Sequence, residues 1–283
     1  MVVKTINSNG PDDFAFPDLK NSRVPFDDVV SKIHALGTDY LTGVVGNVTY
    51  WGVTLPIHFL ATKDYNTSKP SMAVFGGVHG DEPAGTYSVL EYARQAAGDG
   101  LNYTFIPLIN PSGFILGTRE NALNVDINRD FDTCESMETR LVKGFLQERG
   151  KRFDLAFVLH EDNTDKPVEG FKVEDNPLGF YVYEYSPKGR MWGKQVVKAV
   201  EACGFPVCRG ERVYEDTAEG GVIRMPHTQE TLEREKGQLF IELLGHTNHV
   251  LVPETPTCHE MGYRVRTLVA CMHAGKKLVS EGQ

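Results

Sequence analysis

The sequence predicts an α/β fold: one domain built on a mixed, mostly parallel twisted sheet with helices on both faces. Segments rich in β-branched and aromatic residues alternate along the chain with segments whose apolar residues recur at helical spacing. The 283 residues contain no internal repeat, low-complexity tract or linker. Because a chain of this length buries enough apolar surface to fold without disulfide bonds, we expect a single domain over residues 1–283.

The first half of the chain supplies its elements in alternation. Residues 1–25 are rich in Asn, Asp, Pro and Ser and predict an irregular lead-in. An amphipathic run then predicts a helix from Pro25 that stops at Gly37. The patterns that follow predict three or four strands between residues 40 and 76, a helix after Pro83, a strand at 103–110, and a helix over 137–149 that ends at Gly150.

The second half continues the alternation. It predicts a strand ending at His160, a strand at 179–185, a helix over 188–203, a strand at 238–244 and a terminal helix over 259–278. Strands that alternate with helices in this way indicate a sheet covered on both faces.

Charge and cysteine content narrow the class of protein. Lys and Arg number 29 against 38 Asp and Glu, a net charge of −9, and an acidic surface disfavours nucleic acid or anionic lipid as the main partner. The five cysteines are scattered without a CxxC pair, so we expect neither disulfides nor a thiolate zinc site, and a reducing compartment. With no leader-like N-terminus and no run of 18 apolar residues, we expect a cytoplasmic protein without a membrane partner.

Four polar residues lie at or within predicted strands: His79, Asn110, His160 and Glu242. The carboxyl ends of strands line the ligand crevice of open α/β sheets. We therefore expect these side chains to converge although they are far apart in sequence.

His79 and Glu82 form the strongest local signal. They lie in the stretch Gly-Gly-Val-His-Gly-Asp-Glu-Pro, where a histidine and a carboxylate three residues apart at a tight turn can bind one metal ion. His160 would complete a His2Glu set with a fourth position for water, which is typical of hydrolytic zinc. The alternative is a solvated loop with a capping carboxylate.

A second stretch, residues 110–131, contains the pattern NPxG…R…N…VDxNRxF. Together with His79 and Glu82, it closely resembles the zinc carboxypeptidase family, also called funnelins. The run from Arg119 to Arg129 is most similar to the bacterial murein tripeptide amidase branch, whose members cut a terminal diaminopimelate from cell-wall peptides. The resemblance extends over about residues 45–275 and implies a zinc carboxypeptidase-like fold.

The resemblance implies that His79, Glu82 and His160 bind one zinc ion per chain. It also implies that Arg119 polarises the scissile carbonyl and stabilises the oxyanion, which agrees with the usual form of electrostatic catalysis. Asp126 in the same stretch is expected to be structural, bonding the backbone or an arginine.

The remaining matched positions would act on the substrate and on water. Asn128 and Arg129 match the pair that grips the terminal carboxylate, for which a guanidinium offers a planar fork. Glu242 matches the general base that takes a proton from water and passes it to the leaving amine. The alternatives are surface salt bridges for Arg119 and Arg129, and a buried ion pair for Glu242.

Residues 213–224 resemble the family segment that carries a mobile tyrosine. Tyr214 is the candidate, with a packing role equally open. Ile223 falls near the family's pocket-floor position and suggests an apolar substrate side chain, whereas Arg224 beside it would attract an acidic one. Glu161 and Asp162 depart from the pattern expected after the third ligand; they either support His160 or face solvent.

The sequence thus predicts a zinc-dependent metallocarboxypeptidase or amidase that hydrolyses the terminal amide bond of a peptide with a free C-terminal carboxylate. The alternative is a deacylase of N-acyl amino acids, similar to aspartoacylase and succinylglutamate desuccinylase, which share the His/Glu/His site and the Asn-Arg pair. The nine-residue interval from Arg119 to Asn128 favours the amidase branch. A catalytically silent binding protein on the same fold is a third reading, which the intact matched positions disfavour.

Overall fold

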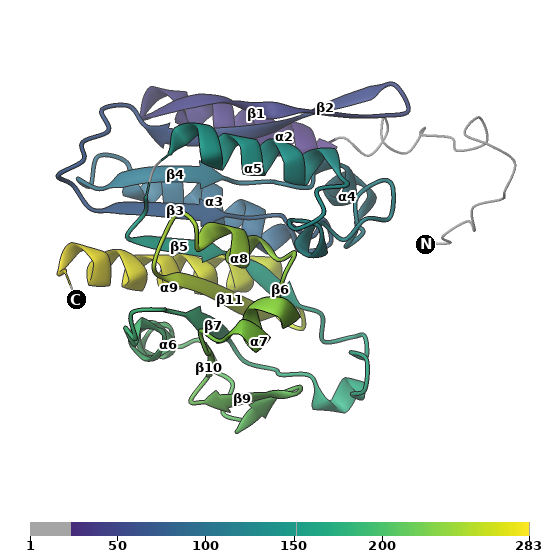
Figure 1. Cartoon of the computed structure of the whole chain (residues 1–283), viewed down its shortest axis with the longest axis vertical. Coiled ribbons are helices and arrows are strands. Elements are labelled where there is room, and N and C mark those ends of the chain that lie inside the picture. The colour runs from purple at the N-terminus through teal and green to yellow at the C-terminus, as the bar shows by residue number, and fades with distance from the viewer. Residues whose placement is uncertain (1–23, 151, 283) are drawn as a thin grey trace, which may run out of the picture.

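The computed structural model describes residues 24–150 and 152–282, and its centre is one continuous eleven-stranded sheet (Figure 1). The strand order is β1-β2-β4-β3-β5-β11-β7-β10-β9-β8, with β6 paired to β11 beyond the end of β5. The lead-in predicted for residues 1–25 lies almost wholly outside the described residues.

The strands have the following bounds: β1 Tyr40–Tyr50, β2 Val53–Thr62, β3 Ser71–Phe75, β4 Asn102–Ile106, β5 Leu155–Val158, β6 His160–Asp162, β7 Tyr181–Tyr185, β8 Arg212–Val213, β9 Asp216–Glu219, β10 Val222–Met225 and β11 Val250–Pro256. The pairings β4–β3, β3–β5 and β5–β11 in the middle of the sheet are parallel. Antiparallel pairs flank them on both sides, so the sheet is mixed, as expected, with its parallel part confined mainly to the centre.

The helices have the following bounds: α2 Val24–Ala35, α3 Pro83–Ala96, α4 Pro111–Leu116, α5 Met137–Arg149, α6 Trp192–Ala202, α7 Gln229–Arg234, α8 Leu239–Leu243 and α9 Met261–Ser280, with short 3-10 turns at Leu36–Thr38, Ile127–Arg129 and Val173–Asp175. A contiguous layer of α2, α3, α9 and α6 covers one face of the sheet, and α5 and α8 pack on the other. The prediction of helices on both faces is confirmed.

One predicted element is wrong. Residues Leu239–Leu243, in the segment predicted as a strand, form helix α8, and the central strand of this region is β11, further along the chain. A short apolar run does not distinguish a strand from a buried helix. The true strand contains Pro253 and Pro256, which obscure a strand pattern because proline is disfavoured inside sheets.

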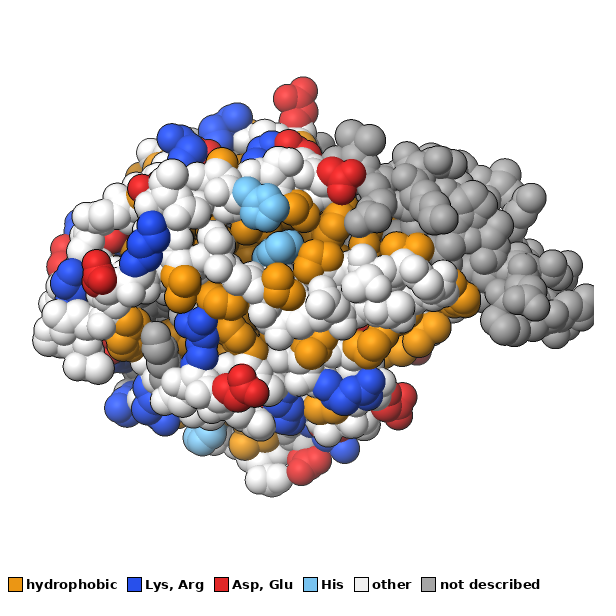
Figure 2. Space-filling model, turned by 90° about the horizontal axis from the view of Figure 1, so that it is seen from above, with side chains coloured by type: hydrophobic (Ala, Val, Ile, Leu, Met, Phe, Trp, Pro, Cys, Tyr) orange, Lys and Arg blue, Asp and Glu red, His pale blue; other side chains and the backbone are white. Residues whose placement is uncertain are grey.

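Strand β1 forms one edge, where Figure 2 shows apolar side chains gathered between charged groups. Leu41 and Val44 of β1 are among the exposed large hydrophobic residues.

Among the described helices, none has both the length and the apolar composition that a membrane span requires. All five cysteines are free thiols, as predicted.

Candidate metal centre and active-site cleft

The turn between β3 and α3 places His79 and Glu82 at the carboxyl end of the sheet's central strands. Gly77 has a φ of 59°, a left-handed conformation that glycine adopts without a Cβ penalty. Gly80 lies against the backbone of α4, where a Cβ would be 1.9 Å from the carbonyl carbon of Gly113. Pro83 then starts α3 with the φ that a first helical turn needs.

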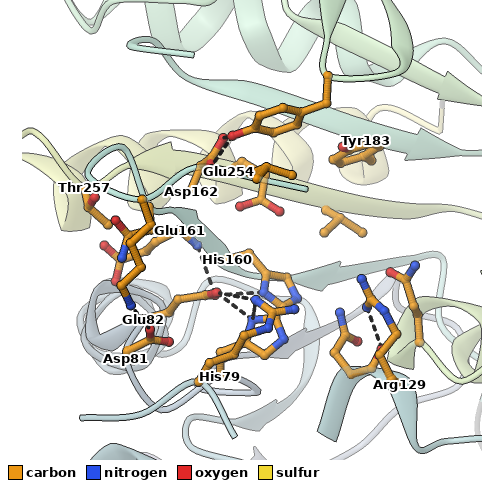
Figure 3. A pocket seen from close by; sticks show the side chains of 18 of the residues that line it. His79, Asp81, Glu82, Arg129, His160, Glu161, Asp162, Tyr183, Glu254 and Thr257 are labelled. Carbon is orange, nitrogen blue, oxygen red and sulfur yellow. Dashed lines mark hydrogen bonds and ion pairs between the residues drawn. The ribbon is translucent and has the colours of Figure 1, made fainter. Parts of the chain in front are cut away.

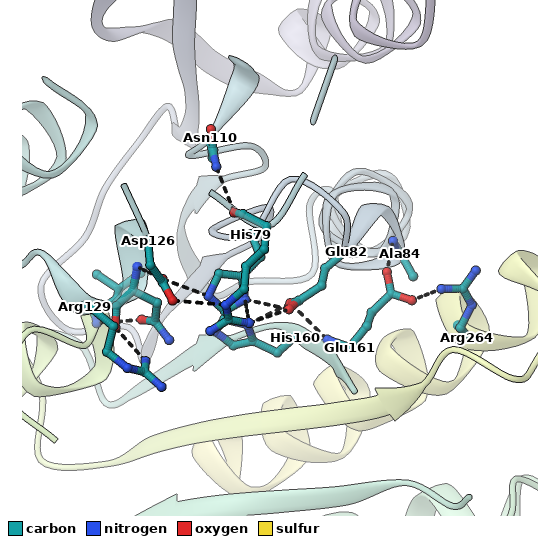
Figure 4. Close-up of polar contacts among 12 residues, drawn as sticks. His79, Glu82, Ala84, Asn110, Asp126, Arg129, His160, Glu161 and Arg264 are labelled. Atoms are coloured by element: carbon teal, nitrogen blue, oxygen red, sulfur yellow. Dashed lines mark hydrogen bonds and ion pairs between the residues drawn. The ribbon is translucent and has the colours of Figure 1, made fainter. Parts of the chain in front are cut away.

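His160 begins β6 and completes the cluster from another strand. The Glu82 carboxylate contacts both histidines, with Oε1 2.5 Å from His79 Nδ1 and Oε2 2.8 Å from His160 Nδ1 (Figure 4). The three side chains are buried, and their ligand atoms all lie within 4.8 Å of one another. The structure therefore brings together the three residues predicted as metal ligands.

This cluster fits a zinc ion on the chemistry of its donors. Two imidazole nitrogens and one carboxylate, converging in a buried position, match the three protein ligands of catalytic zinc sites. His79 Nε2 lies 3.3 Å from Asp126 Oδ1, on the far side of the ring from Nδ1, the nitrogen that contacts Glu82. Burial acts to raise the pKa of Glu82, but His79 and His160 overcome it and hold the pKa below its usual range.

Arg119 lies beside this cluster. Its Nε donates to Asp126 Oδ2 at 3.0 Å, and its Nη1 is 3.1 Å from His79 Nδ1 and 3.7 Å from Glu82 Oε1. The prediction that Asp126 bonds an arginine is confirmed. Arg119 thus has one structural partner and one edge directed at the position where the ligands converge.

A cleft of about 730 Å³ opens over the cluster. Its walls include residues from the metal cluster, from the loops after β4 and β6, and from β7, β10 and β11: His79, Glu82, Arg119, Asn128, Arg129, His160, Asp162, Lys166, Tyr183, Tyr214, Met225, Phe240, Val252 and Glu254 among others. Figure 3 shows Arg129 on one side of the two histidines, and Asp162 and Thr257 on the other.

Asn128 and Arg129 are held differently. Asn128 Oδ1 accepts a hydrogen bond from the backbone of Leu239 at 3.0 Å, which fixes its side chain. Arg129 is exposed, and its Nη1 donates to the Asn128 carbonyl at 2.8 Å. Among the described residues, no carboxylate lies within ion-pair distance of Arg129, and its side chain lines the cleft.

Glu254 is the cleft carboxylate that the sequence analysis missed. It pairs in register with His160 across the parallel β6–β11 pair, which puts both side chains on the same face of the sheet. Figure 3 shows it pointing toward the histidines. Burial, with the nearby Glu82 and Asp162, raises the pKa of Glu254 well above its usual range; a cation bound at the cluster would oppose this and favour the ionised form.

The prediction of Glu242 as a site residue is corrected. Glu242 lies on α8 outside the cleft lining, and its Oε2 is 3.0 Å from Lys143 Nζ. The ion pair left open as the alternative is what the structure contains. The signal for Glu254, a carboxylate in the apolar run VLVPETP, was present in the sequence but hidden by its prolines.

The predicted pocket-floor residues are also corrected. Ile223 is buried in β10 and Arg224 is exposed on the opposite face of that strand, and neither lines the cleft. Met225 lines it instead. Side chains alternate along a strand. An alignment error of one position therefore puts a residue on the wrong face of the sheet, and an error of two positions moves it along the strand.

Tyr214 does line the cleft, and it contacts Asp162. Its hydroxyl is 2.8 Å from both carboxylate oxygens of Asp162, which also accepts a hydrogen bond from Tyr181 at 2.9 Å. Glu161 is buried against Arg264 and accepts a hydrogen bond from the Ala84 amide at 2.6 Å. Neither acidic residue after His160 faces solvent.

Comparisons with known proteins agree with this geometry. A sequence model of the succinylglutamate desuccinylase/aspartoacylase catalytic domain matches residues 68–172. Carboxypeptidase E of Caenorhabditis elegans is 30% identical over 131 residues, covering 38% of this chain and 27% of that protein. Carboxypeptidase SOL1 of Arabidopsis thaliana is 36% identical over 76 residues, covering 23% and 16%. Over parts of its length, the chain is therefore similar in sequence both to carboxypeptidases and to the succinylglutamate desuccinylase/aspartoacylase catalytic domain.

Solved structures share the fold of this chain. A chain from Shewanella denitrificans OS217, proposed to be a metallopeptidase, superimposes with a TM-score of 0.70 at 20% identity and 89% coverage of both chains. Carboxypeptidase A from Helicoverpa armigera gives a TM-score of 0.61 at 12% identity, covering 89% of this chain and 71% of the other. The chain spans less than a third of the length of the two curated carboxypeptidases.

Proposed function

We propose that the protein is a zinc-dependent metallocarboxypeptidase or amidase that hydrolyses the terminal amide bond of a substrate with a free C-terminal carboxylate. His79, Glu82 and His160 hold one zinc ion per chain. Bound there, zinc supplies Lewis-acid polarisation of the scissile carbonyl and lowers the pKa of water.

The observation that supports this proposal best is the exposed guanidinium of Arg129, which lines the same cleft as the His/Glu/His cluster. Arginine binds a carboxylate in a bidentate manner, and Asn128 beside it is fixed by its bond to Leu239. A substrate carboxylate bound at Arg129 puts the neighbouring amide bond toward the histidines.

Each step of the reaction is then carried out by a different residue of this chain. Glu254, on the strand next to His160, accepts a proton from the attacking water and passes it to the leaving amine. Arg119, whose Nη1 lies against the cluster, stabilises negative charge on the carbonyl oxygen. Asn128 and Arg129 hold the carboxylate.

The second candidate is a deacylase of N-acyl amino acids, and the sequence match over residues 68–172 favours it. That match spans the three proposed ligands together with Arg119, Asn128 and Arg129, and it ends before Glu254. The same residues would serve both reactions, because both substrates carry a free carboxylate next to the scissile amide. The two candidates differ only in the acyl group.

Product identification by mass spectrometry tests the proposal. The purified protein is incubated with a library of peptides, their C-terminal amides, and N-acetyl and N-succinyl amino acids, with and without a zinc chelator. We expect chelator-sensitive release of single residues from free-acid peptides and none from the C-terminal amides. Release of acetate or succinate without peptide cleavage would instead establish the deacylase. Products that form equally in the presence of chelator would contradict both candidates.

A further inference from the structure

We propose that residues 163–180, here named the cap segment, close the acyl side of the cleft and restrict the enzyme to substrates with a short acyl group, such as N-acyl amino acids and di- or tripeptides. The inference rests on the proposed function and names the substrate class for that same cleft.

The geometry of the cleft defines its acyl side. Figure 3 shows Arg129 on one side of the histidines, and Asp162 and Thr257 on the other. A substrate whose carboxylate is at Arg129 and whose scissile carbonyl is at the histidines must extend its acyl group toward Asp162. The cap segment begins directly after Asp162, and Asn163, Lys166, Pro167 and Val168 of the cap line the cleft.

The cap segment is held together from within by Asn176. This residue is 5% exposed, and its Nδ2 is 3.3, 3.2 and 2.8 Å from the backbone carbonyls of Asn163, Thr164 and Lys166. A buried amide that satisfies several backbone carbonyls fixes a loop, because each bond lost would leave a buried polar group without a partner. The cap segment is therefore a built wall of the cleft.

The cap segment is also fixed to its surroundings on two sides. Thr164 donates its backbone N–H to Thr257 Oγ1 at 3.0 Å, which ties the cap to the residue after β11. Lys166 Nζ lies 3.8 Å from Asp81 Oδ2, beside the ligand Glu82. These contacts join the cap segment to the residue after β11 and to the turn that carries Glu82.

Tyr214 reinforces the cap from the β8–β9 turn. Its ring meets Phe171 of the cap edge-on, with centroids 5.3 Å apart, and its hydroxyl lies between Asp162 and Asn176 Oδ1. Tyr214 has a φ of 52°, which is uncommon for a bulky residue and persists only where surrounding contacts hold it. The strained backbone and these contacts together indicate that the Tyr214 side chain is held in one position, against the cap segment.

The size of the cleft agrees with a small substrate. At about 730 Å³, it lies within the range of sites that enclose most of a small ligand, roughly 300–1,000 Å³. A long peptide would need an open continuation on the acyl side, which the cap segment occupies.

Cleavage of a graded substrate series tests this inference. The series keeps one C-terminal residue and extends the acyl group from acetyl to five residues. For the zinc-loaded wild type, we expect kcat/KM to fall at least about tenfold once the acyl group exceeds two residues. Asn176→Ala, which loosens the cap, should reduce that fall to less than about threefold while the shortest substrate is cleaved at a similar rate.

Asn102→Ala is the matched control. Asn102 is also a fully buried asparagine whose Nδ2 bonds the backbone carbonyls of Asn66 and Lys69, but it lies at the start of β4, at the opposite end of that strand from the cleft. This variant should keep the wild-type dependence on length. If Asn176→Ala does not fold, Phe171→Ala loosens the same cap from its contact with Tyr214.

Binding to the Glu254→Gln variant separates failure of this inference from failure of the proposed function. With zinc present, calorimetry with a short N-acyl amino acid and with a ten-residue peptide should detect only the short ligand. Equal binding or equal cleavage of both lengths would overturn the inference and leave the proposed function standing. Absence of binding and of cleavage for every member of the series would overturn both.

Discussion

At the residue scale, two glutamates in neighbouring apolar segments occupy different surroundings. Glu254 projects into the cleft from the strand paired with His160, whereas Glu242 forms an ion pair with Lys143 outside it. The sequence alone favours Glu242 because its flanking residues are uninterrupted by proline. The difference is tertiary: strand pairing, not local pattern, decides which carboxylate meets the histidines.

Glutamine substitution at both positions tests this assignment. Glu254→Gln should keep its zinc and lose activity by about 10²–10⁴-fold, because a general base is removed without removing a ligand. Glu242→Gln, the matched control, should stay within about threefold of wild type, since Glu242 lies outside the cleft and its ion pair with Lys143 does not touch the site. Steady-state kinetics with metal analysis distinguishes them. An inactive Glu242→Gln together with an active Glu254→Gln would identify Glu242, and not Glu254, as the general base.

Asp130 shows how one carboxylate orders the loop that follows Arg129. It is 3% exposed and accepts hydrogen bonds from the side chains of Thr133 and Thr139 and from the backbone amides of Glu135 and Ser136. Burial acts to raise the pKa of Asp130, but these hydrogen bonds lower it from 3.8 to about 2. A folded-state pKa below the unfolded value stabilises the protein above about pH 4, and that stability is lost as the pH falls through about 2.

Asp130→Asn should therefore destabilise the protein by about 1–3 kcal/mol at neutral pH. The difference from wild type should shrink between pH 4 and pH 2, where the wild-type carboxylate becomes protonated. Urea unfolding at several pH values measures it, with the exposed Asp64→Asn as a control that should change little. A destabilisation that is the same at every pH would show that the charge of Asp130 has no part in it.

At the element scale, helices were more predictable than the strands that build the site. Helix α5 matches its predicted bounds because both ends have local signals: Ser136 caps its first turn, and Gly150 ends it in a left-handed conformation. Strand β11 has no such signals, and the short strands β8–β10 form only through pairing with one another and with β7. Non-local pairing is not encoded in a local pattern, which is why these strands were missed.

Close packing of the turn between β3 and α3 can be tested by substituting its glycine. Gly80→Ala should destabilise the fold by about 3 kcal/mol or more and weaken zinc binding, because the new Cβ would meet backbone atoms of Gly113 and Phe114. Gly144→Ala in α5 is the control, since nothing lies within 4 Å of its Cβ position. It should be neutral or more stable by up to about 1 kcal/mol. Urea unfolding and metal analysis test both, and a Gly80→Ala protein as stable as wild type would contradict the close packing.

At the scale of the whole molecule, the candidate site joins segments that are far apart in the chain. His79, Glu82, Arg119, Asn128 and Arg129 were predicted through their motifs, and the structure places all of them in the cleft. Glu254, Met225 and the cap segment come from regions without such motifs, and only the assembled sheet brings them to the cleft. Local motifs were enough to predict the residues of the His/Glu/His cluster, but the walls of the cleft depend on tertiary contacts.

Zinc binding at the cluster of His79, Glu82 and His160 should stabilise the entire fold. Zinc at about 1,000 times its dissociation constant adds about 4 kcal/mol, which corresponds to a rise in Tm of roughly 10 °C for a domain of this size. Removing zinc with a chelator should reverse the rise, and Glu82→Gln should show little of it. Differential scanning calorimetry measures these shifts; an equal rise in the variant would assign the stabilising zinc to another place.

The metal content of purified variants tests the central claim most directly. Inductively coupled plasma mass spectrometry should find about one zinc per chain in the wild type and in Glu254→Gln, and less than about a tenth of that in His79→Ala and His160→Ala, because each loses one of three protein ligands. Circular dichroism confirms that the variants are folded. Zinc retained at the wild-type level in both folded histidine variants would contradict the metal centre, and with it the proposed function.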